Sequence, residues 1–348
     1  MSNPDGAAAR ITRISIAEDA RMPEVTEPYI REQLEKRRQE LSVAVATAGP
    51  ATACEELLQE VDAAIVRIER GTYGICEVCQ DTIEKERLIA DPLVRFCLDH
   101  LSGEEQRALE RDLELAARVQ RGLLPQPDIH HLDWHVHYQY QPAGPVSGDY
   151  CDVIAPVNGN RKLTFLLGDV AGKGVAASLL MTHLHAMFRS LSGLELDLAK
   201  LIETANRVFC ESTFAGQYAT LICGHAGPDG QVEITSAGHY PALHISKNGV
   251  AEVCSTGVPL GMFSKSTYTV SCVSLAPGDA LLLYTDGISE AVGPDGKEFG
   301  VAQVARLAAA RHGWPPRKLV GAFLDDVRTF CSTAHQADDQ TLMVIRRT

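Results

Sequence analysis

Four short motifs combine aspartate with glycine or a second aspartate, in a pattern that could bind divalent metal ions. They are SGDY at 147–150, GDVAGKG at 168–174, YTDG at 284–287 and DDQT at 338–341. In three of them an apolar run such as LTFLL ends at an aspartate beside a glycine, and the fourth leads into the apolar run TLMVI. Strand ends that bring carboxylates to one edge can hold hard cations such as Mg²⁺. One Asp-Gly pair alone is more often a turn, as we expect at Asp229 and Asp295, but the four motifs together favour a metal centre.

A second set of residues has the spacing of a zinc site. Cys76 and Cys79 form one pair, and after seventeen further residues Cys97 and His100 form another. Each pair can lie on a turn with both side chains facing one point. Three thiolates and one imidazole make a closed tetrahedral site, which suits structural Zn²⁺. The alternative of four unrelated residues is disfavoured by two paired spacings in one short segment.

Composition limits the classes of protein to which this chain of 348 residues can belong. The formal net charge of -13 argues against a broad electrostatic surface for DNA or RNA, so we expect no nucleic-acid partner. No apolar run reaches ~18 residues, and the N-terminus lacks the apolar core of a secretory signal. We therefore expect a cytoplasmic protein with no membrane partner.

Apolar periodicity indicates the elements that must position these residues. The predicted helices are 28–46, 52–70, 102–124, 175–191, 197–213, 301–311 and 316–331. The predicted strands are 134–140, 163–167, 218–225, 232–236, 242–246, 268–273, 280–284 and 341–345. We divide the chain into a flexible tail, a helical hairpin with the cysteine-bearing segment, a linker helix and a larger domain, at 1–25, 26–101, 102–124 and 125–348. Helices amid many strands make the larger domain an α+β layered sandwich.

The cysteine-bearing segment resembles a known family. The stretch GTYGICEVCQDTIEKERLIADPLVRFC at 71–97 closely resembles the DksA/TraR zinc fingers, and the hairpin before it fits the coiled coil of that family. His100 replaces the usual last cysteine, which zinc tolerates. The hairpin tip at 46–53 lacks the acidic residue that DksA inserts into the RNA polymerase channel. The resemblance therefore implies structural zinc and a sensor or interaction module, with RNA polymerase a doubtful partner.

The acidic motifs, taken in order, resemble the SpoIIE/RsbU branch of the metal-dependent PPM-type protein phosphatases. The runs LAARVQRGLLP (115–125), SAGHYPALH (236–244), GVPLGMF (257–263) and TDGISEA (285–291) also match, so the resemblance covers about 105–348. It implies a β-sandwich flanked by helices and two Mn²⁺ or Mg²⁺ ions in the catalytic site. Two such cations can lower the pKa of a bridging water and neutralise phosphoryl oxygens.

The same resemblance implies roles for individual residues. Asp169 would bridge the two metals, the Val170 carbonyl would bind one of them, and Asp286 and Asp338 would be direct ligands. Asp149 would bind metal or hold a metal-bound water.

Three neighbouring residues have weaker claims to a catalytic role. Asp339 is a weaker ligand candidate, because other branches often have asparagine there. His239 could act as an acid or bind phosphate, but we favour a turn histidine that packs at the sheet edge. Lys173 could contact phosphate, but we favour a solvated loop charge.

The resemblance predicts a phosphoserine/phosphothreonine protein phosphatase. Its substrate would be a phosphorylated STAS-type anti-sigma-factor antagonist in a partner-switching pathway. The alternative is an RNA-polymerase-binding regulator of DksA type, with a degenerate phosphatase domain as scaffold. The four intact acidic motifs argue against degeneracy.

The predicted linker helix carries a short heptad pattern. Its positions are Leu109, Leu113, Ala116, Gln120 and Leu123. This pattern is typical of a coiled-coil seam with one polar position, so we expect a homodimer whose helix transmits the state of the zinc module to the catalytic site. The alternative is a helix that packs on its own phosphatase domain.

Overall fold

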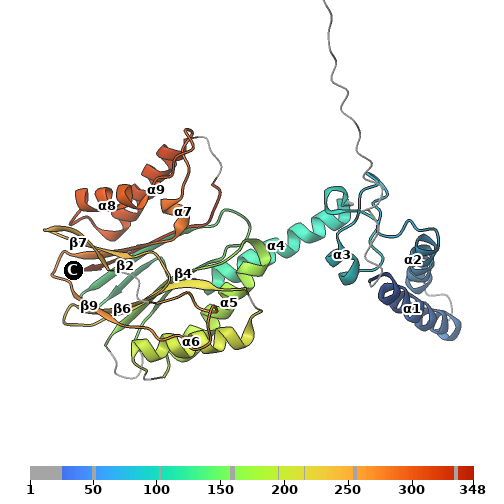
Figure 1. Ribbon diagram of the computed structural model, residues 1–348, viewed down its shortest axis with the longest axis horizontal. Helices are drawn as coiled ribbons and strands as arrows, with labels where there is room; N and C mark the ends of the chain where they lie inside the picture. The colour runs from blue at the N-terminus through green and yellow to red at the C-terminus, as the bar shows by residue number, and fades with distance from the viewer. Residues whose placement is uncertain are drawn as a thin grey trace, which may run out of the picture. The chain divides into compact units, whose positions relative to one another are not determined.

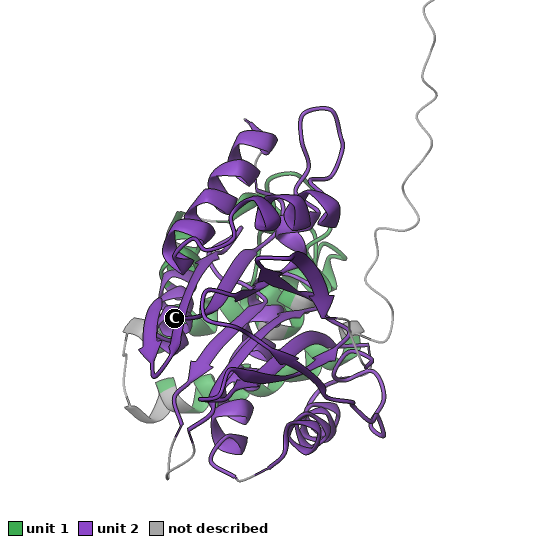
Figure 2. Ribbon diagram, turned by 90° about the vertical axis from the view of Figure 1, so that its left-hand side faces the viewer, with its two compact units in different colours: residues 1–111 green, residues 112–348 purple. Residues whose placement is uncertain are grey.

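The computed structural model describes residues 26–48, 52–101, 103–156, 161–194, 196–214, 216–253, 257–332 and 336–348. The predicted flexible tail at 1–25 lies outside these residues, as do positions 49–51 of the hairpin tip. The chain divides into two compact units, residues 1–111 and 112–348 (Figure 2). Each unit is described by itself.

The first unit is a helical hairpin followed by a compact loop segment. Its elements are α1 (Thr26–Ala48), α2 (Thr52–Glu69), α3 (Lys85–Ala90), the 3-10 helix η1 (Leu98–His100) and the start of α4 (Gly103–Leu123). One apolar core joins α1, α2 and α3, with Ile30 and Leu34 from α1, Val61 from α2 and Leu88 from α3. The two predicted helices of the hairpin are confirmed, with ends shifted by at most two residues.

The second unit is a sandwich of two antiparallel sheets (Figure 1). One sheet has the order β1-β2-β11-β10-β7-β8, and the other has the order β3-β4-β5-β6-β9. The strands are β1 (Asp128–His131), β2 (Trp134–Gln141), β3 (Asp149–Ile154), β4 (Leu163–Val170), β5 (Ala219–Ala226), β6 (Gln231–Ala237), β7 (Ala242–Ser246), β8 (Gly249–Val253), β9 (Ser271–Ser274), β10 (Ala280–Tyr284) and β11 (Gln340–Arg347). The core between the sheets includes Trp134 and Met343 from one and Phe165 and Ile222 from the other.

Helices cover both outer faces of this sandwich (Figure 1). Helices α5 (Gly174–Leu191) and α6 (Leu198–Ser212) pack on the sheet that contains β4, whereas α8 (Val301–Ala310) and α9 (Pro316–Cys331) pack on the other. The short α7 (Asp286–Ser289) follows β10. The predicted fold class, a β-sandwich flanked by helices after a helical hairpin, is confirmed. Among the described residues, no helix combines the length and apolar character that crossing a bilayer requires.

One strand differs from its prediction in a way that affects the site. The sequence predicts that the strand from residue 163 ends before Gly168, but β4 continues through Asp169 to Val170. Gly168 suits this position because a Cβ atom there would lie 2.6 Å from the carbonyl oxygen of Thr220 on β5. Asp169 therefore lies on the sheet itself rather than on a following turn.

Candidate functional site

The predicted acidic residues come from both sheets of the second unit. Asp149 opens β3 and Asp169 lies near the end of β4, where the two residues pair in register. Asp286 begins α7 directly after β10, and Asp338 lies just before β11, the strand that pairs with β10. The sandwich thus gathers two aspartates from each sheet, although they are far apart in sequence.

Asp149 joins the two sheets through its carboxylate. Its Oδ2 atom accepts hydrogen bonds from the hydroxyls of Thr285 (3.0 Å), which follows β10, and Thr341 (2.5 Å), which lies in β11. The residue is 1% exposed, and its Oδ1 atom has no hydrogen-bond partner among the described residues. Burial, reinforced by the charge of Asp169, raises the pKa of this carboxyl well above its ordinary value. A buried carboxylate with one oxygen unpaired fits a cation ligand.

The other carboxylates are crowded together. Burial raises the pKa of Asp169 to about 8, and the charges of Asp286 and Asp338 add to the effect. Burial, followed by the charge of Asp338, also raises the pKa of Asp286. Among the residues that the structure describes, no three of these carboxylates have oxygens that all lie within 4.8 Å of one another. Concentrated, partly buried negative charge of this kind fits divalent cations with oxygen ligands.

Two glycines allow the backbone segments of the site to approach closely. A Cβ atom at Gly148 would lie 3.1 Å from the carbonyl oxygen of Val170 and 3.4 Å from Oδ1 of Asp169. A Cβ atom at Gly287 would collide with the carbonyl of Asp339. The Val170 carbonyl, a predicted metal ligand, therefore lies beside a residue that has no side chain to cover it.

Asp339 and Lys173 make specific contacts around these aspartates. Both carboxylate oxygens of Asp339 accept backbone N–H bonds, Oδ1 from Ala143 at 2.7 Å and Oδ2 from Gly148 at 2.9 Å. Asp339 thus holds the loop before Asp149 in place, a role that the sequence did not reveal. The exposed Lys173 lies with its Nζ atom 2.9 Å from Oδ2 of Asp338, so it is a loop charge, as favoured, but one with an acidic partner.

His239 agrees with the packing interpretation. The residue is 4% exposed, and its Nδ1 atom lies 2.8 Å from the hydroxyl oxygen of Thr220 on β5. Burial lowers the pKa of His239 to about 4, so the ring is neutral at physiological pH. A neutral, enclosed imidazole supports the sheet and is poorly suited to donate a proton to a substrate.

Gln120 on α4 connects the linker helix to the site. Its side-chain amide donates a hydrogen bond to the carbonyl of Ser147 at 2.7 Å and accepts one from the Ser147 N–H at 3.0 Å. Gln120 is 5% exposed. The expectation that this residue forms the polar position of a dimer seam is therefore wrong. Its side-chain amide instead bonds to the backbone of Ser147 in the same chain, and Ser147 lies two residues before Asp149.

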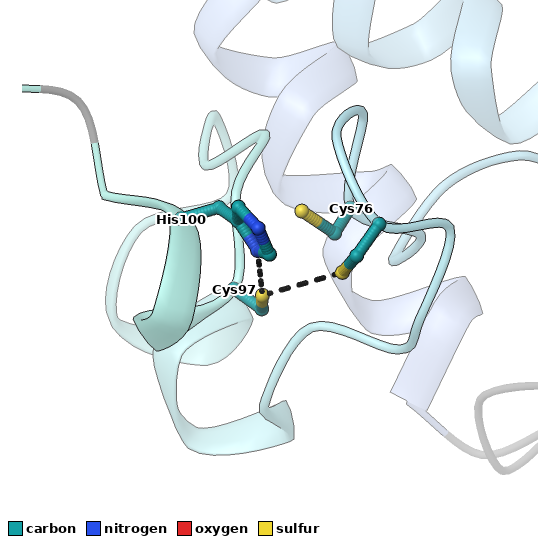
Figure 3. A group of neighbouring side chains, drawn as sticks. Cys76, Cys97 and His100 are labelled. Carbon is teal, nitrogen blue, oxygen red and sulfur yellow. Dashed lines mark hydrogen bonds between the residues drawn. The ribbon is translucent and has the colours of Figure 1, made fainter.

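The predicted zinc ligands of the first unit form a compact cluster. One ligand atom from each of Cys76, Cys79, Cys97 and His100 lies within 4.8 Å of all the others. Sγ of Cys97 is 3.7 Å from Sγ of Cys79 and 3.3 Å from Nδ1 of His100. Figure 3 labels three members of the cluster, Cys76, Cys97 and His100. Burial opposes ionisation of the Cys76 thiol, but hydrogen bonds from backbone groups of Cys79 and Cys97 outweigh it and lower the pKa to about 6. The donor set and its spacing fit a tetrahedral Zn²⁺.

Comparison with protein families identifies both units. Residues 159–348, more than half of the chain, match the family described as Stage II sporulation protein E (SpoIIE). The chain belongs to the SpoIIE family. Residues 71–99 match the prokaryotic dksA/traR C4-type zinc finger. His100, immediately after the matched stretch, stands where a four-cysteine finger has its last thiolate.

This SpoIIE-family chain matches its curated relatives over only part of their length. Protein IcfG of Synechocystis sp. is 25% identical in an alignment 267 residues long, which covers 68% of this chain and 41% of that protein. Phosphoserine phosphatase RsbU of Bacillus subtilis is 28% identical over 192 residues, which are 53% of this chain and 55% of that protein. The chain thus spans about half the length of these relatives.

Among solved structures, the SiaA-PP2C domain of Pseudomonas aeruginosa has the same fold. It superposes with a TM-score of 0.62 at 20% identity, over 71% of this SpoIIE-family chain and 99% of that domain. The likeness confirms the PPM-type sandwich.

The raised pKa of Asp169 predicts a pH-dependent stability difference in the SpoIIE-family protein without added Mg²⁺ or Mn²⁺. The folded-state pKa of about 8 exceeds the ordinary 3.8, so folding favours the protonated form and the contribution of Asp169 is lost as pH rises through this range. Asp169→Asn should therefore gain stability relative to wild type between about pH 4 and pH 8. Urea unfolding at several pH values measures this difference. A constant difference across the range would contradict the assignment.

Proposed function

We propose that this protein is a metal-dependent phosphoserine/phosphothreonine protein phosphatase. The observation that carries the proposal is the set of crowded, partly buried aspartates that two sheets bring together. Membership of the SpoIIE family supports it, as does similarity to a protein named phosphoserine phosphatase. An acidic site of this kind is expected to repel a phosphoryl group unless cations neutralise it.

The proposed ligands of two Mn²⁺ or Mg²⁺ ions are Asp169, the Val170 carbonyl, Asp286 and Asp338. Bound cations would supply charge neutralisation and acidify a water molecule. Asp149 would hold its unpaired Oδ1 toward a cation or its water, while the hydroxyls of Thr285 and Thr341 fix the orientation of the carboxylate.

Metal-dependent hydrolysis of p-nitrophenyl phosphate tests the activity. We expect hydrolysis with added Mn²⁺ or Mg²⁺ and none without. No hydrolysis of this compound or of any phosphoprotein, with metal present, would overturn the proposal.

The proposed substrate is a phosphorylated STAS-type anti-sigma-factor antagonist. The support is the resemblance of the motifs to the SpoIIE/RsbU branch and the 28% identity with RsbU. Phosphorylated STAS proteins from the same genome should release phosphate with the enzyme. If p-nitrophenyl phosphate were hydrolysed but every STAS phosphoprotein resisted, the substrate class would be wrong and the phosphatase assignment would stand.

We also propose that α4 regulates the site through Gln120. Gln120→Ala removes both hydrogen bonds to Ser147 and leaves two buried backbone groups unpaired, at a cost of ~1–3 kcal/mol each. The loop that leads to Asp149 should then shift, and turnover should fall about ten- to a hundredfold. Steady-state kinetics across a Mn²⁺ series measures the loss. The matched control is Gln106→Ala, an exposed glutamine on the same helix, and equal turnover of both variants would rule the coupling out.

We still propose a homodimer, but with a helix contact formed by other residues of α4. Leu115 and Val119 are 53% and 55% exposed and lie one turn apart on α4. They are better placed for a partner helix than Gln120 is. Sedimentation of wild type and Leu115→Asp tests this, and a monomeric wild type would refute it.

A further inference from the structure

The hairpin that begins the phosphatase domain presents a group of polar side chains on one face. In the register of β1 and β2, His130 pairs with His135 and Asp128 pairs with His137. Because side chains alternate along a strand, these four residues share one face of the hairpin. The opposite face of β2 carries buried Val136, which packs in the core between the sheets. The four side chains therefore lie on the face of the hairpin that does not pack into the core between the sheets.

Three of these side chains have the spacing of metal ligands. One ligand atom each from Asp128, His130 and His135 lies within 4.8 Å of the other two. Oδ1 of Asp128 is 2.6 Å from Nε2 of His135, and the rings of His130 and His135 stack with centroids 3.9 Å apart. Ligand atoms bound to one Zn²⁺ at ~2.0–2.1 Å lie ~3.3 Å from each other. Small side-chain rotations would bring the three atoms to that spacing.

We propose that Asp128, His130 and His135 bind a divalent transition-metal ion of the Zn²⁺ or Ni²⁺ kind. Two imidazoles and one carboxylate suit such borderline cations, whereas Mg²⁺ and Mn²⁺ prefer sites made only of oxygen. The site is thus chemically distinct from the aspartate centre and, lacking thiolates, from the cysteine cluster. Asp128 and His130 are exposed and His135 is half-buried, so water can complete the coordination.

The surroundings are consistent with a site that is open on one side. Nδ1 of His137 lies 3.5 Å from Oδ1 of Asp128. A surface pocket lined by Asp128, His137, Gln139 and Arg317 adjoins the group and leaves room for water. A bound cation would fasten β1, a four-residue strand at the edge of its sheet, to β2.

Calorimetric titration with Ni²⁺ tests the site in the full chain. The protein carries no polyhistidine tag, keeps its finger zinc, and is held in excess Mg²⁺ so that the oxygen-ligand centre is occupied. We expect one Ni²⁺ per chain. His130→Gln and His135→Gln should each weaken binding about tenfold or more, because even the loss of an outer partner of a metal ligand costs ~10–100-fold.

His131→Gln is the matched control, since His131 lies on the same strand but faces the other side. Its Ni²⁺ affinity should equal that of wild type. Tryptophan fluorescence of each variant confirms that the domain is folded, because both tryptophans lie in the second unit. Absence of Ni²⁺ binding by the wild type, or the same affinity in His130→Gln as in His131→Gln, would overturn the proposal.

Discussion

Asp169→Asn is expected to reduce phosphatase turnover by about three orders of magnitude at saturating Mn²⁺. Asp169 is the most central of the acidic residues, since it pairs with Asp149 across β3 and β4 and senses the charges of Asp286 and Asp338. Asparagine keeps the shape of the side chain but removes a charged ligand that both cations would share. Hydrolysis of p-nitrophenyl phosphate over a Mn²⁺ series measures the loss.

The matched control is Asp229→Asn, an exposed aspartate in a turn beside Gly230. This variant should keep full activity. Without added metal, Asp169→Asn should also unfold at a higher urea concentration than wild type near pH 8, because it removes a carboxyl whose ionisation is opposed by burial and by the neighbouring carboxylates. Near-normal turnover in Asp169→Asn would show that the ligand assignment is wrong, whereas a loss of stability would make the residue structural.

Cys97→Ser should release zinc and unfold residues 71–101 while the sandwich stays folded. Cys97 is 4% exposed and contacts both Cys79 and His100, so its loss opens the cluster at its centre. Structural zinc contributes ~10–16 kcal/mol to the folding of a small finger. With His130→Gln present in both proteins, so that the proposed β1–β2 site is removed, the zinc content should fall from one ion per chain to none. Circular dichroism should show loss of local structure.

The two units can be monitored separately in this experiment. Both tryptophans of the chain, Trp134 and Trp314, belong to the second unit, so their fluorescence should keep its wild-type unfolding midpoint. Cys272→Ser, which changes an exposed cysteine on β9, is the control and should retain zinc. In the same His130→Gln background, a Cys97→Ser protein that still holds one zinc per chain would refute the assigned ligand set.

Local apolar periodicity predicted the longer helices, whereas the β-sandwich and the roles of the site residues came from the resemblance of the acidic motifs to a known family. Three strands were missed, namely β1, β3, which opens with Asp149, and β8. The residues of β1, Asp128–His131, are mostly polar, and its place follows from pairing with β2. The extension of β4 through Asp169 was missed because Gly168 is read as a turn residue unless the close approach of Thr220 is known.

Contacts between distant segments explain the remaining differences. Gln120 fits a heptad position, but its partner is the backbone of Ser147, 27 residues away. Asp339 was considered a weaker ligand candidate because other branches often have asparagine at this position. Its two hydrogen bonds, to the backbone N–H groups of Ala143 and Gly148, span almost two hundred residues. No periodicity encodes such pairs. Thr285 and Thr341 lie within the acidic motifs, so the sequence did contain a clue that their hydroxyls could hold Asp149.

The position of β11 has a consequence for folding during synthesis on the ribosome. This strand, Gln340–Arg347, is made after every other strand described, yet it lies between β2 and β10 inside its sheet. Strands β2 and β10 therefore cannot be joined into one sheet until β11 has been synthesised, although domains tend to fold as they emerge from the ribosome. Thr341, which β11 carries, completes the hydrogen bonding of Asp149. A nascent chain should accordingly lack the proposed phosphatase activity until β11 leaves the exit tunnel.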